Sequence, residues 1–411
     1  MNQGLRWRFS VMMFLEYMIW GAWFPDFSVY MKKIGFSDPQ SGFIYSLLPI
    51  GCMVAPFIGG QLADRYFASE KLIGVLHLLG GGFLFAAAGM TSYDQLWPVM
   101  LAWALVYAPT LALTNSLCFH HMPEAEKEFG LVRVWGTIGW IIVGWLLAKV
   151  VRGALAGTMN SLGGFDGLWM AGVFSILLGV FSFFLPHTPA QKKGENPWAF
   201  LEALKMLRDP QFAIFITIAF VVATELMFYF VLTAPFLEAS GITPGQTPKW
   251  MTIAQIAEIG TMLALPWMLT HWGVRKTMVI GILAWPVRYA IFAIGNPLWL
   301  VIAALSLHGL CYVCFFTVAY IYVNQVAEAD IKASAQGLIT FVTLGVGLFI
   351  GSNFAGYISN LFTETAASGG PVVNYTKVFL VPLVLTVICA VIFTFAFRDR
   401  AVKQAQVEPA G

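Results

Sequence analysis

The chain has 411 residues, of which 59% are hydrophobic and only 11% are charged, and its formal net charge is +2. Soluble domains carry about 25% charged residues, so this composition excludes an ordinary soluble protein. The mean hydropathy is +0.75, and apolar runs recur at lengths of about 20 residues, which is the length that crosses a bilayer core. We therefore expect an all-α membrane protein that crosses the lipid bilayer many times.

Twelve apolar segments follow one another along the chain, and each is long enough to form a spanning helix. The first six lie near residues 9–30, 41–62, 72–91, 96–118, 131–151 and 167–186. The second six lie near residues 211–237, 250–271, 276–294, 297–323, 333–361 and 377–397. The first segment is longer than the apolar part of a signal peptide and shows no cleavage motif, so we expect it to remain as a spanning helix.

A polar segment divides the twelve segments into two sets of six. Lysine and arginine are concentrated in the loops on the side that would carry both ends of the chain, which predicts that both termini are cytoplasmic. We expect a multi-pass protein of the cell inner (plasma) membrane. Its predicted parts are an N-terminal six-helix bundle at 1–187, a cytoplasmic linker at 188–210, a C-terminal six-helix bundle at 211–400 and a cytoplasmic tail at 401–411.

Six plus six spans with a basic central loop is the plan of the major facilitator transporters, whose two bundles are related by pseudo-two-fold symmetry. The segment "GGQLADRYFASEK" resembles the loop signature of that superfamily, with Gly60, Asp64 and Arg65 in place. The segment "HWGVRK" in the second half is a weaker echo. Glu16 and Glu225 stand at equivalent points of the two halves, which also favours a repeat.

Ionisable residues inside apolar spans are functional candidates because burying them in a membrane is costly. Such residues here are Glu16, Arg133, Glu225, Glu258 and Arg288, joined by Asp26 near the end of a span and by two histidines, His77 and His308. The chain contains no motif of a hydrolase, a metalloprotease or a phosphate-binding loop. We therefore predict that the protein is not an enzyme, and no motif implies a metal or a cofactor.

Arg133 and Glu258 lie in the fifth and eighth spans, which face each other in major facilitator transporters. We predict that they form a charge-assisted pair, which would offset part of the cost of burying both ions. The alternative is a static pair that only joins the two halves. Thr137 and Trp140 share a helix face with Arg133, and Gln255 shares one with Glu258. Together these side chains suit a neutral solute that bears hydroxyl groups and a ring.

Several stretches resemble the nucleoside:proton symporter family of the major facilitator superfamily, the bacterial nucleoside permeases. They are "FLEYMIWGAW", "YAPTLALTNSL", "VRVWGTIGW", "IAQIAEI", "WGVRKTMVIGILAWPVRYAIFAIGNP" and "IKASAQG". The resemblance covers most of the chain and implies a nucleoside pocket between the two halves. The family's substrate-binding positions fall on Arg133, Thr137, Trp140, Gln255, Glu258 and Tyr312.

Other positions depart from the family pattern. In the seventh span Met227 and Phe230 stand where the family has glutamine and asparagine, and in the tenth span Val313 stands at the acidic position implicated in proton coupling. A family tyrosine is His308, and the usual glutamine of the first span is Glu16. Either the substrate has become a less polar ring compound or a modified nucleoside, or proton coupling has moved to Glu16 or His308, or coupling has been lost.

These patterns predict a secondary transporter that imports nucleosides by alternating access, coupled to protons. The candidate proton sites are Glu258, Glu16 and His308. The alternative for Glu16 is a carboxylate that bonds to its neighbours without turnover. Other functional interpretations are a transporter of another small polar solute, such as a sugar or a modified nucleoside, with or without proton coupling, and a membrane-embedded receptor. The expected partners are a small solute, protons and the lipid bilayer, and no nucleic acid or obligate protein partner is implied.

Overall fold

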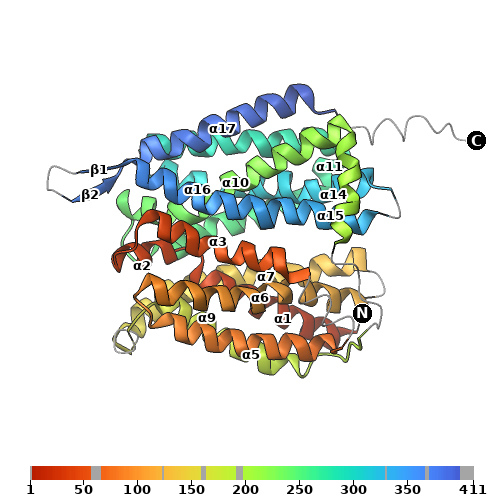
Figure 1. The fold of residues 1–411 in the computed structure, drawn as a ribbon, viewed down its shortest axis with the longest axis horizontal. Helices are drawn as coiled ribbons and strands as arrows, with labels where there is room; N and C mark the ends of the chain where they lie inside the picture. The colour runs from red at the N-terminus through yellow and green to blue at the C-terminus, as the bar shows by residue number, and fades with distance from the viewer. Residues whose placement is uncertain are drawn as a thin grey trace, which may run out of the picture. The chain divides into compact units, whose positions relative to one another are not determined.

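The computed structural model describes residues 2–56, 66–122, 125–158, 163–190, 198–328, 331–365 and 370–398. These residues form helices and a short antiparallel hairpin of β1 (Thr363–Thr365) and β2 (Pro371–Val373), in which Thr363 lies opposite Val373 (Figure 1). The loop signature with Gly60, Asp64 and Arg65 lies outside the described residues.

The helices up to residue 208 are α1 (Gln3–Trp23), α2 (Phe27–Lys33), α3 (Asp38–Ala55), α5 (Ser69–Ala88), α6 (Tyr93–His121), α7 (Ala125–Leu146), the π-helical η2 (Leu147–Ala154), α9 (Asp166–Ser182) and the 3-10 helix η3 (Ala199–Arg208). The later helices are α10 (Pro210–Ala239), α11 (Thr247–Ile294), α12 (Leu298–Leu305), α13 (Leu307–Cys311), the π-helical η4 (Tyr312–Thr317), α14 (Val318–Val326), α15 (Lys332–Thr340), the π-helical η5 (Phe341–Gly347), α16 (Leu348–Leu361) and α17 (Tyr375–Ala396).

Eight helical stretches among the described residues are long and apolar enough to cross a membrane, judged by length and composition. They are Ser69–Ala88, Tyr93–His121, Glu128–Ala154, Pro210–Ala239, Thr247–Ile294, Leu298–Val326, Ser334–Leu361 and Tyr375–Ala396. The predicted spans 250–271 and 276–294 both fall in α11, whose helical backbone is interrupted at Gly273, where φ is 74°. Because that φ suits glycine and strains other residues, Gly273 separates α11 into two helical arms.

The predicted first span at 9–30 is wrong at its end, because α1 stops at Trp23. Asp26 has a non-helical backbone, with φ −131° and ψ 13°, and the separate helix α2 starts at Phe27. The Asp26 carboxylate bonds to the guanidinium of Arg152, far along the chain. A polar tertiary contact therefore stands at the point where hydropathy alone predicts a continuous helix.

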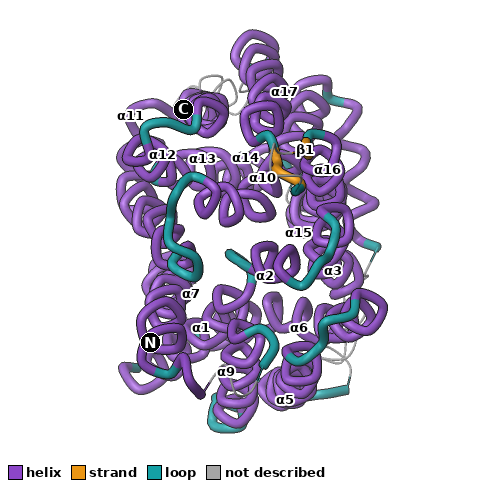
Figure 2. The backbone as a smooth tube through the Cα atoms, turned by 90° about the vertical axis from the view of Figure 1, so that its left-hand side faces the viewer, coloured by secondary structure: helices purple, strands orange, loops and turns teal. Residues whose placement is uncertain are grey.

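Contacts divide the chain into two compact units, one of residues 1–197 with 230–252 and one of residues 198–229 with 253–411. In the first unit α1 packs against α6, α7 and α9, while α5 packs against α6 and α9 and α3 against α6 (Figure 2). Close approach of α1 and α7 depends on Gly139, where an added Cβ would meet the main-chain carbonyl of Phe14. In the second unit Gly351 of α16 lies in the same way against the backbone of Thr224 in α10. Small residues at such crossings are typical of membrane helices.

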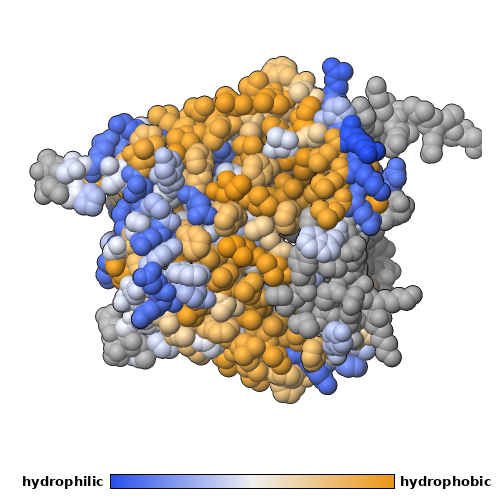
Figure 3. Space-filling model, viewed as in Figure 1, coloured by the Kyte–Doolittle hydropathy of each residue, from blue (hydrophilic) through white to orange (hydrophobic). Residues whose placement is uncertain are grey.

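Large apolar side chains also cover outer faces of the helices, as the wide orange areas of Figure 3 show. Phe184 in the first unit is 67% exposed, and Leu263 and Phe395 in the second are each 78% exposed. Exposed apolar surface on this scale would be unfavourable in water. A surrounding bilayer removes that cost, because lipid chains are as apolar as these side chains.

Candidate functional site

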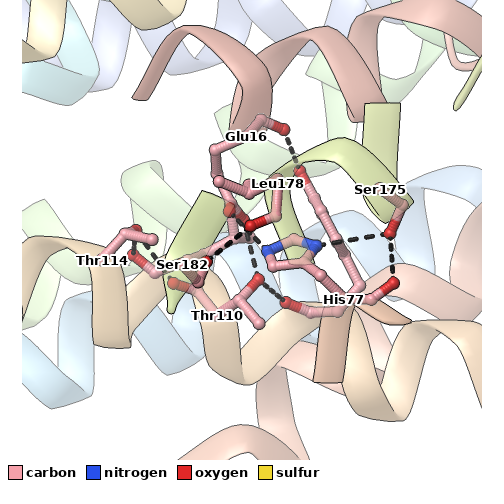
Figure 4. Close-up of polar contacts among 9 residues, drawn as sticks. Glu16, His77, Thr110, Thr114, Ser175, Leu178 and Ser182 are labelled. Carbon is pink, nitrogen blue, oxygen red and sulfur yellow. Dashed lines mark hydrogen bonds and ion pairs between the residues drawn. The ribbon is translucent and has the colours of Figure 1, made fainter. Parts of the chain in front are cut away.

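The middle of α1 holds a buried carboxyl group. Glu16 is fully buried, and its two oxygens meet side chains from two other helices (Figure 4). Nε2 of His77, from α5, lies 2.8 Å from Oε2, and the hydroxyl of Thr110, from α6, donates to Oε1 at 2.7 Å. Both partners are themselves at most 1% exposed. These bonds replace the water that Glu16 loses on burial.

Two further side chains fix the backbone and the ring of this group. The Tyr107 hydroxyl donates to the main-chain carbonyl of Glu16 at 2.8 Å. The Ser175 hydroxyl, from α9, donates to the main-chain carbonyl of His77 at 2.8 Å and lies 3.4 Å from its Nδ1. We call Glu16, His77, Tyr107, Thr110 and Ser175 the Glu16 cluster. Because its members come from α1, α5, α6 and α9, the packing of the first unit sets its geometry.

Arg133, the cation that the sequence places in the fifth span, lies on α7 over the ring of Tyr17, with 3.9 Å from its guanidinium carbon to the ring centroid. A guanidinium over an aromatic face is stabilised by about 0.5–2 kcal/mol, more when water is excluded. Tyr17 directly follows Glu16 on α1. The predicted substrate-binding arginine and the Glu16 cluster are therefore adjacent within the first unit.

Trp140, a predicted substrate-binding residue, belongs to a group of rings that we call the aromatic cluster: Trp20, Phe24, Trp140 and Phe230. The rings of Trp20 and Trp140 lie 5.5 Å apart, and Phe24 is 6.4 Å from Trp140 and 5.1 Å from Phe230. Phe230 is one of the two positions in the seventh span that depart from the family pattern, and the other, Met227, is fully buried. Thr137 is partly exposed on the same helix as Trp140.

The predicted substrate-binding residues of the second unit lie on α11 and η4. Glu258 and Tyr312 are partly exposed, whereas Gln255 is 6% exposed and its Oε1 has no hydrogen-bond partner among the described residues. A buried amide oxygen without a partner is costly, so a solute that donates a hydrogen bond there would stabilise it. Tyr312 stacks on His308, with ring centroids 5.7 Å apart.

His308 also faces a buried cation. Nη1 of Arg288 lies 3.2 Å from its Nδ1, and Arg288 is fully buried among the rings of Tyr229, Trp285 and Tyr289. Because a guanidinium can only donate, Nδ1 accepts that bond and carries no proton. Protonation of Nδ1 would break its hydrogen bond to Arg288, so this arrangement disfavours His308 as the proton site.

Glu225 stands at the point of the second half that corresponds to Glu16. Its main-chain carbonyl accepts a hydrogen bond from the hydroxyl of Tyr289 at 2.5 Å, as that of Glu16 does from Tyr107. The two carboxyl groups differ, because both side-chain oxygens of Glu225 are buried without a hydrogen-bond partner among the described residues. The two glutamates therefore share the hydrogen bond from a tyrosine to the main-chain carbonyl, but their carboxyl groups differ in their hydrogen-bond partners.

A second charged group in the first unit centres on Arg152 of η2. Its Nη1 donates to Asp26 at 2.5 Å and to the carbonyl of Gly245 at 3.2 Å, and its Nε and Nη2 donate to the two oxygens of Asp166 at 2.7 Å each. The guanidinium thus joins the α1–α2 turn, the start of α9 and the α10–α11 turn. Sequence reasoning selected Asp26 but missed these partners, because hydropathy does not pair charges that lie at span ends.

The predicted pair of Arg133 and Glu258 stays a prediction, since the two residues belong to units that are described separately. Sequence reasoning also noted His77 as a titratable group without finding its bond to Glu16. The two residues are 61 positions apart, and no local pattern links them. Thr110 and Ser175 carried no sequence signal, because serine and threonine are common in membrane helices and usually bond to their own helix.

Comparison with known proteins gives a consistent result. The model of the family described as "Nucleoside H+ symporter" matches residues 3–402. A putative nucleoside transporter of Escherichia coli (strain K12), YegT, is 34% identical over 401 residues, which cover 95% of this chain and 93% of that protein. Xanthosine permease of the same organism is 31% identical, with 95% of each chain covered.

Among solved structures, a crystal structure of the nucleoside transporter NupG superposes with a TM-score of 0.83 at 25% identity. The superposition covers 97% of this chain and all of the NupG chain. The likeness in sequence and in backbone therefore extends over nearly the whole length.

Proposed function

This chain belongs to the nucleoside H+ symporter family of the major facilitator superfamily, and we propose that it imports nucleosides across the cell inner membrane by alternating access, together with protons. It is a multi-pass membrane transporter and not an enzyme. The observation that carries the proposal is the family match over residues 3–402. The further proposal that the transporter has twelve spans in two pseudo-symmetric bundles rests on the hydropathy pattern.

The residues that we propose to contact the nucleoside are Arg133, Thr137 and Trp140 in the first unit and Gln255, Glu258 and Tyr312 in the second. Each has a side chain suited to the task. The guanidinium, hydroxyl and amide groups can bond to sugar hydroxyls and base edges, and the rings can stack on a base. The unpartnered Oε1 of Gln255 supports this assignment. Glu258, Glu16 and His308 remain the candidates for the proton site.

Uptake into proteoliposomes tests this function. Purified protein is reconstituted, and radiolabelled uridine, adenosine and xanthosine are offered with and without an inward proton gradient. We expect accumulation above the external concentration with the gradient, and loss of accumulation when a protonophore is added. Binding without uptake of any nucleoside would contradict transport, and uptake that ignores the gradient would contradict coupling.

One observation favours a less polar nucleoside as the substrate. The aromatic cluster places Phe230 against Phe24, next to Trp140, and Met227 is buried on the same helix as Phe230. The rings of Phe24 and Phe230 offer no hydrogen bond, so they penalise a hydroxyl group that must leave water to lie against them. We therefore propose that deoxynucleosides or base-modified nucleosides are preferred over ribonucleosides.

Competition experiments separate these substrates. We expect deoxyuridine to compete better than uridine for uptake by the natural chain. Phe230→Asn should raise the relative uptake of uridine about tenfold, the effect of one satisfied hydrogen bond of about 1.4 kcal/mol, whereas the apolar control Phe230→Leu should not. Equal competition by the two nucleosides, unchanged by Phe230→Asn, would contradict the preference.

A further inference from the structure

We propose that Glu16 and His77 together form the proton-binding site of this transporter, and that Thr110 and Ser175 hold the pair ready to gain or lose one proton. This inference rests on the proposed function for its role in transport, but the site itself is argued from the first unit alone. The ligand is one proton, which forms an O–H bond on Glu16 or an N–H bond on His77 and leaves by breaking that bond.

The net charge of the pair depends on how many protons it holds. Glu16 is 0% exposed and His77 is 1% exposed, with 2.8 Å between Oε2 and Nε2. Ionised Glu16 with neutral His77 carries one negative charge. Protonated Glu16 with an imidazolium at His77 carries one positive charge. Because a net charge in a membrane interior is costly, the buried arrangement favours a single proton held between the two groups.

The Thr110 hydroxyl has one hydrogen to donate and two acceptors within reach. Oγ1 lies 2.7 Å from Oε1 of Glu16 and 2.6 Å from the main-chain carbonyl of Tyr107. When Glu16 is ionised, Thr110 can donate to the carboxylate. When Oε1 is protonated, Glu16 can donate to Thr110, and Thr110 can donate to the carbonyl. The hydroxyl therefore satisfies both protonation states by rotation, and the heavy atoms need not move.

Ser175 can serve the imidazole ring in a similar way. Its hydroxyl donates to the carbonyl of His77, which leaves a lone pair on Oγ, and this oxygen lies 3.4 Å from Nδ1. A protonated ring can thus direct one N–H to Glu16 and the other to Ser175. Each hydroxyl can therefore bond to the pair with or without the proton. A reversible proton carrier needs this, since a donor or acceptor left unmatched in one protonation state would make that state too costly to populate.

Neighbouring helices bring few other ionisable groups to this level. Tyr107 comes from α6, Arg133 from α7 and Cys52 from α3, and the ring of Tyr17, from α1, contacts the guanidinium of Arg133. α5 contributes His77 itself, and α9 contributes the uncharged Ser175. Arg133 is the formal cation among these groups, and it is also a proposed nucleoside contact. A solute that draws the guanidinium away from Tyr17 would change the field at Glu16, which gives substrate and proton a direct physical link.

Two side chains of the same helices provide matched controls, and both are drawn in Figure 4. Thr114, four residues after Thr110 on α6, donates to the main-chain carbonyl of Thr110 at 2.9 Å. Ser182, seven residues after Ser175 on α9, donates to the carbonyl of Leu178 at 2.7 Å. Both hydroxyls are buried, as are those of Thr110 and Ser175, but within the described part of the chain they donate to main-chain carbonyls. Substitutions there remove a buried hydroxyl without removing a partner of Glu16 or His77.

The first experiment tests coupling with Glu16→Gln in the full chain in proteoliposomes. The amide keeps the shape and can still bond to Thr110 and His77, but it cannot take up a proton. We expect exchange of labelled for unlabelled nucleoside to remain measurable, while accumulation in a proton gradient falls to the external concentration and the pH change that accompanies uptake disappears. Proton-driven accumulation at the natural level in this variant would overturn the proposal.

The second experiment measures the pH at which accumulation is half-maximal. Thr110→Val removes a hydroxyl that serves both states but bonds more strongly to the ionised carboxylate, so the proton should bind more tightly and the midpoint should move up by about one pH unit. His77→Gln removes one of the two groups that can hold the proton while keeping an N–H donor toward Glu16, so the proton should bind less tightly and the midpoint should move down. The controls Thr114→Val and Ser182→Ala should leave the midpoint in place. His187→Gln is a third control, because His187 bonds to Glu70 at 2.8 Å and its side chain is 67% exposed. Equal midpoints in all variants would contradict the proposal.

The third experiment needs no nucleoside and so separates this proposal from the proposed function. Infrared difference spectra of the purified protein, recorded as the pH is changed, detect the carbonyl band of a protonated carboxyl group. We expect a band that titrates in the natural chain and is absent in Glu16→Gln, but present in Thr114→Val. If the band titrates and no nucleoside is transported, the proton site stands and the proposed substrate is wrong. If neither the carbonyl band of Glu16 nor an imidazolium ring band of His77 titrates, the proton site is wrong whatever the transport assays show.

Discussion

At the residue scale, Arg133 shows how a cation is accommodated in an apolar helix. Its guanidinium lies over the face of Tyr17, and this contact offsets part of the cost of burial. The sequence argument had assigned that task to Glu258. The two descriptions are compatible, because a guanidinium stacked on a ring still has N–H groups that can donate to a carboxylate or to a solute.

The role of Glu258 gives a prediction at this scale. Glu258→Gln removes a charge that we propose to contact the nucleoside, and we expect it to reduce accumulation at least tenfold, since a charged hydrogen bond is worth about 1.5–3 kcal/mol. Uptake in cells and in proteoliposomes measures the effect. Glu202→Gln, at an exposed position of η3, is the control. Gradient-driven uptake at the natural level in Glu258→Gln would remove that residue from the mechanism.

At the element scale, polar contacts at helix ends decide where the helices of the first unit turn. Arg152 joins three turns through Asp26, Asp166 and the carbonyl of Gly245. The side chain of Arg152 is 15% exposed and that of Asp26 is 4% exposed, so water solvates these ions poorly. The two bonds from one guanidinium to Asp166 are the planar, two-pronged geometry that favours arginine over lysine.

We therefore predict that Arg152→Gln destabilises the protein by about 3 kcal/mol, because it leaves the buried Asp26 carboxylate without its cation. The stability of Arg152→Lys should lie between those of Arg152→Gln and the natural chain, since one ammonium cannot reproduce the two-pronged bond to Asp166. The unfolding temperatures of the three purified proteins in detergent give this order of stability. Lys149→Gln, at an exposed position of the same helix, should unfold at the same temperature as the natural chain. If Arg152→Gln unfolds at the same temperature, the three turns do not depend on this guanidinium.

At the scale of the whole molecule, the outer apolar faces and the long apolar helices are explained by the bilayer. Exposed side chains such as Leu263 and Phe395 would face lipid. A backbone in lipid must satisfy its own hydrogen bonds, which is why helices dominate the described part of the chain. The distribution of lysine and arginine predicts that both termini lie on the cytoplasmic side of the membrane.

The predicted orientation is tested by fusion reporters. We expect a green fluorescent protein fused after Gly411 to fluoresce, because the C-terminus is predicted to be cytoplasmic. An alkaline phosphatase fused after Ser240, in the turn between α10 and α11, should be active, because that turn is predicted to lie on the outer, non-cytoplasmic side of the membrane. The reverse pattern would show that the charge distribution does not set the topology of this chain.

The sequence determined the class of this protein, the approximate places of its long helices and the identity of the ionisable residues inside them. The reason is that spanning a bilayer constrains length and hydropathy locally, so a run of about 20 apolar residues carries its own signal. The family resemblance, drawn from short stretches such as "VRVWGTIGW", is confirmed by the match over residues 3–402.

Only the tertiary structure decided which of these residues meet. In a membrane helix the face toward lipid and the face toward other helices are both apolar, so the pattern does not report which side is buried or against what. Glu16 and His77 are 61 positions apart, and Arg152 and Asp26 are 126 apart. Their contacts arise from the packing of α1, α5, α6 and α9 and from the turns that join them. For that reason the sequence could name Glu16 as a candidate, while the partners that make it a plausible proton carrier emerged from the fold.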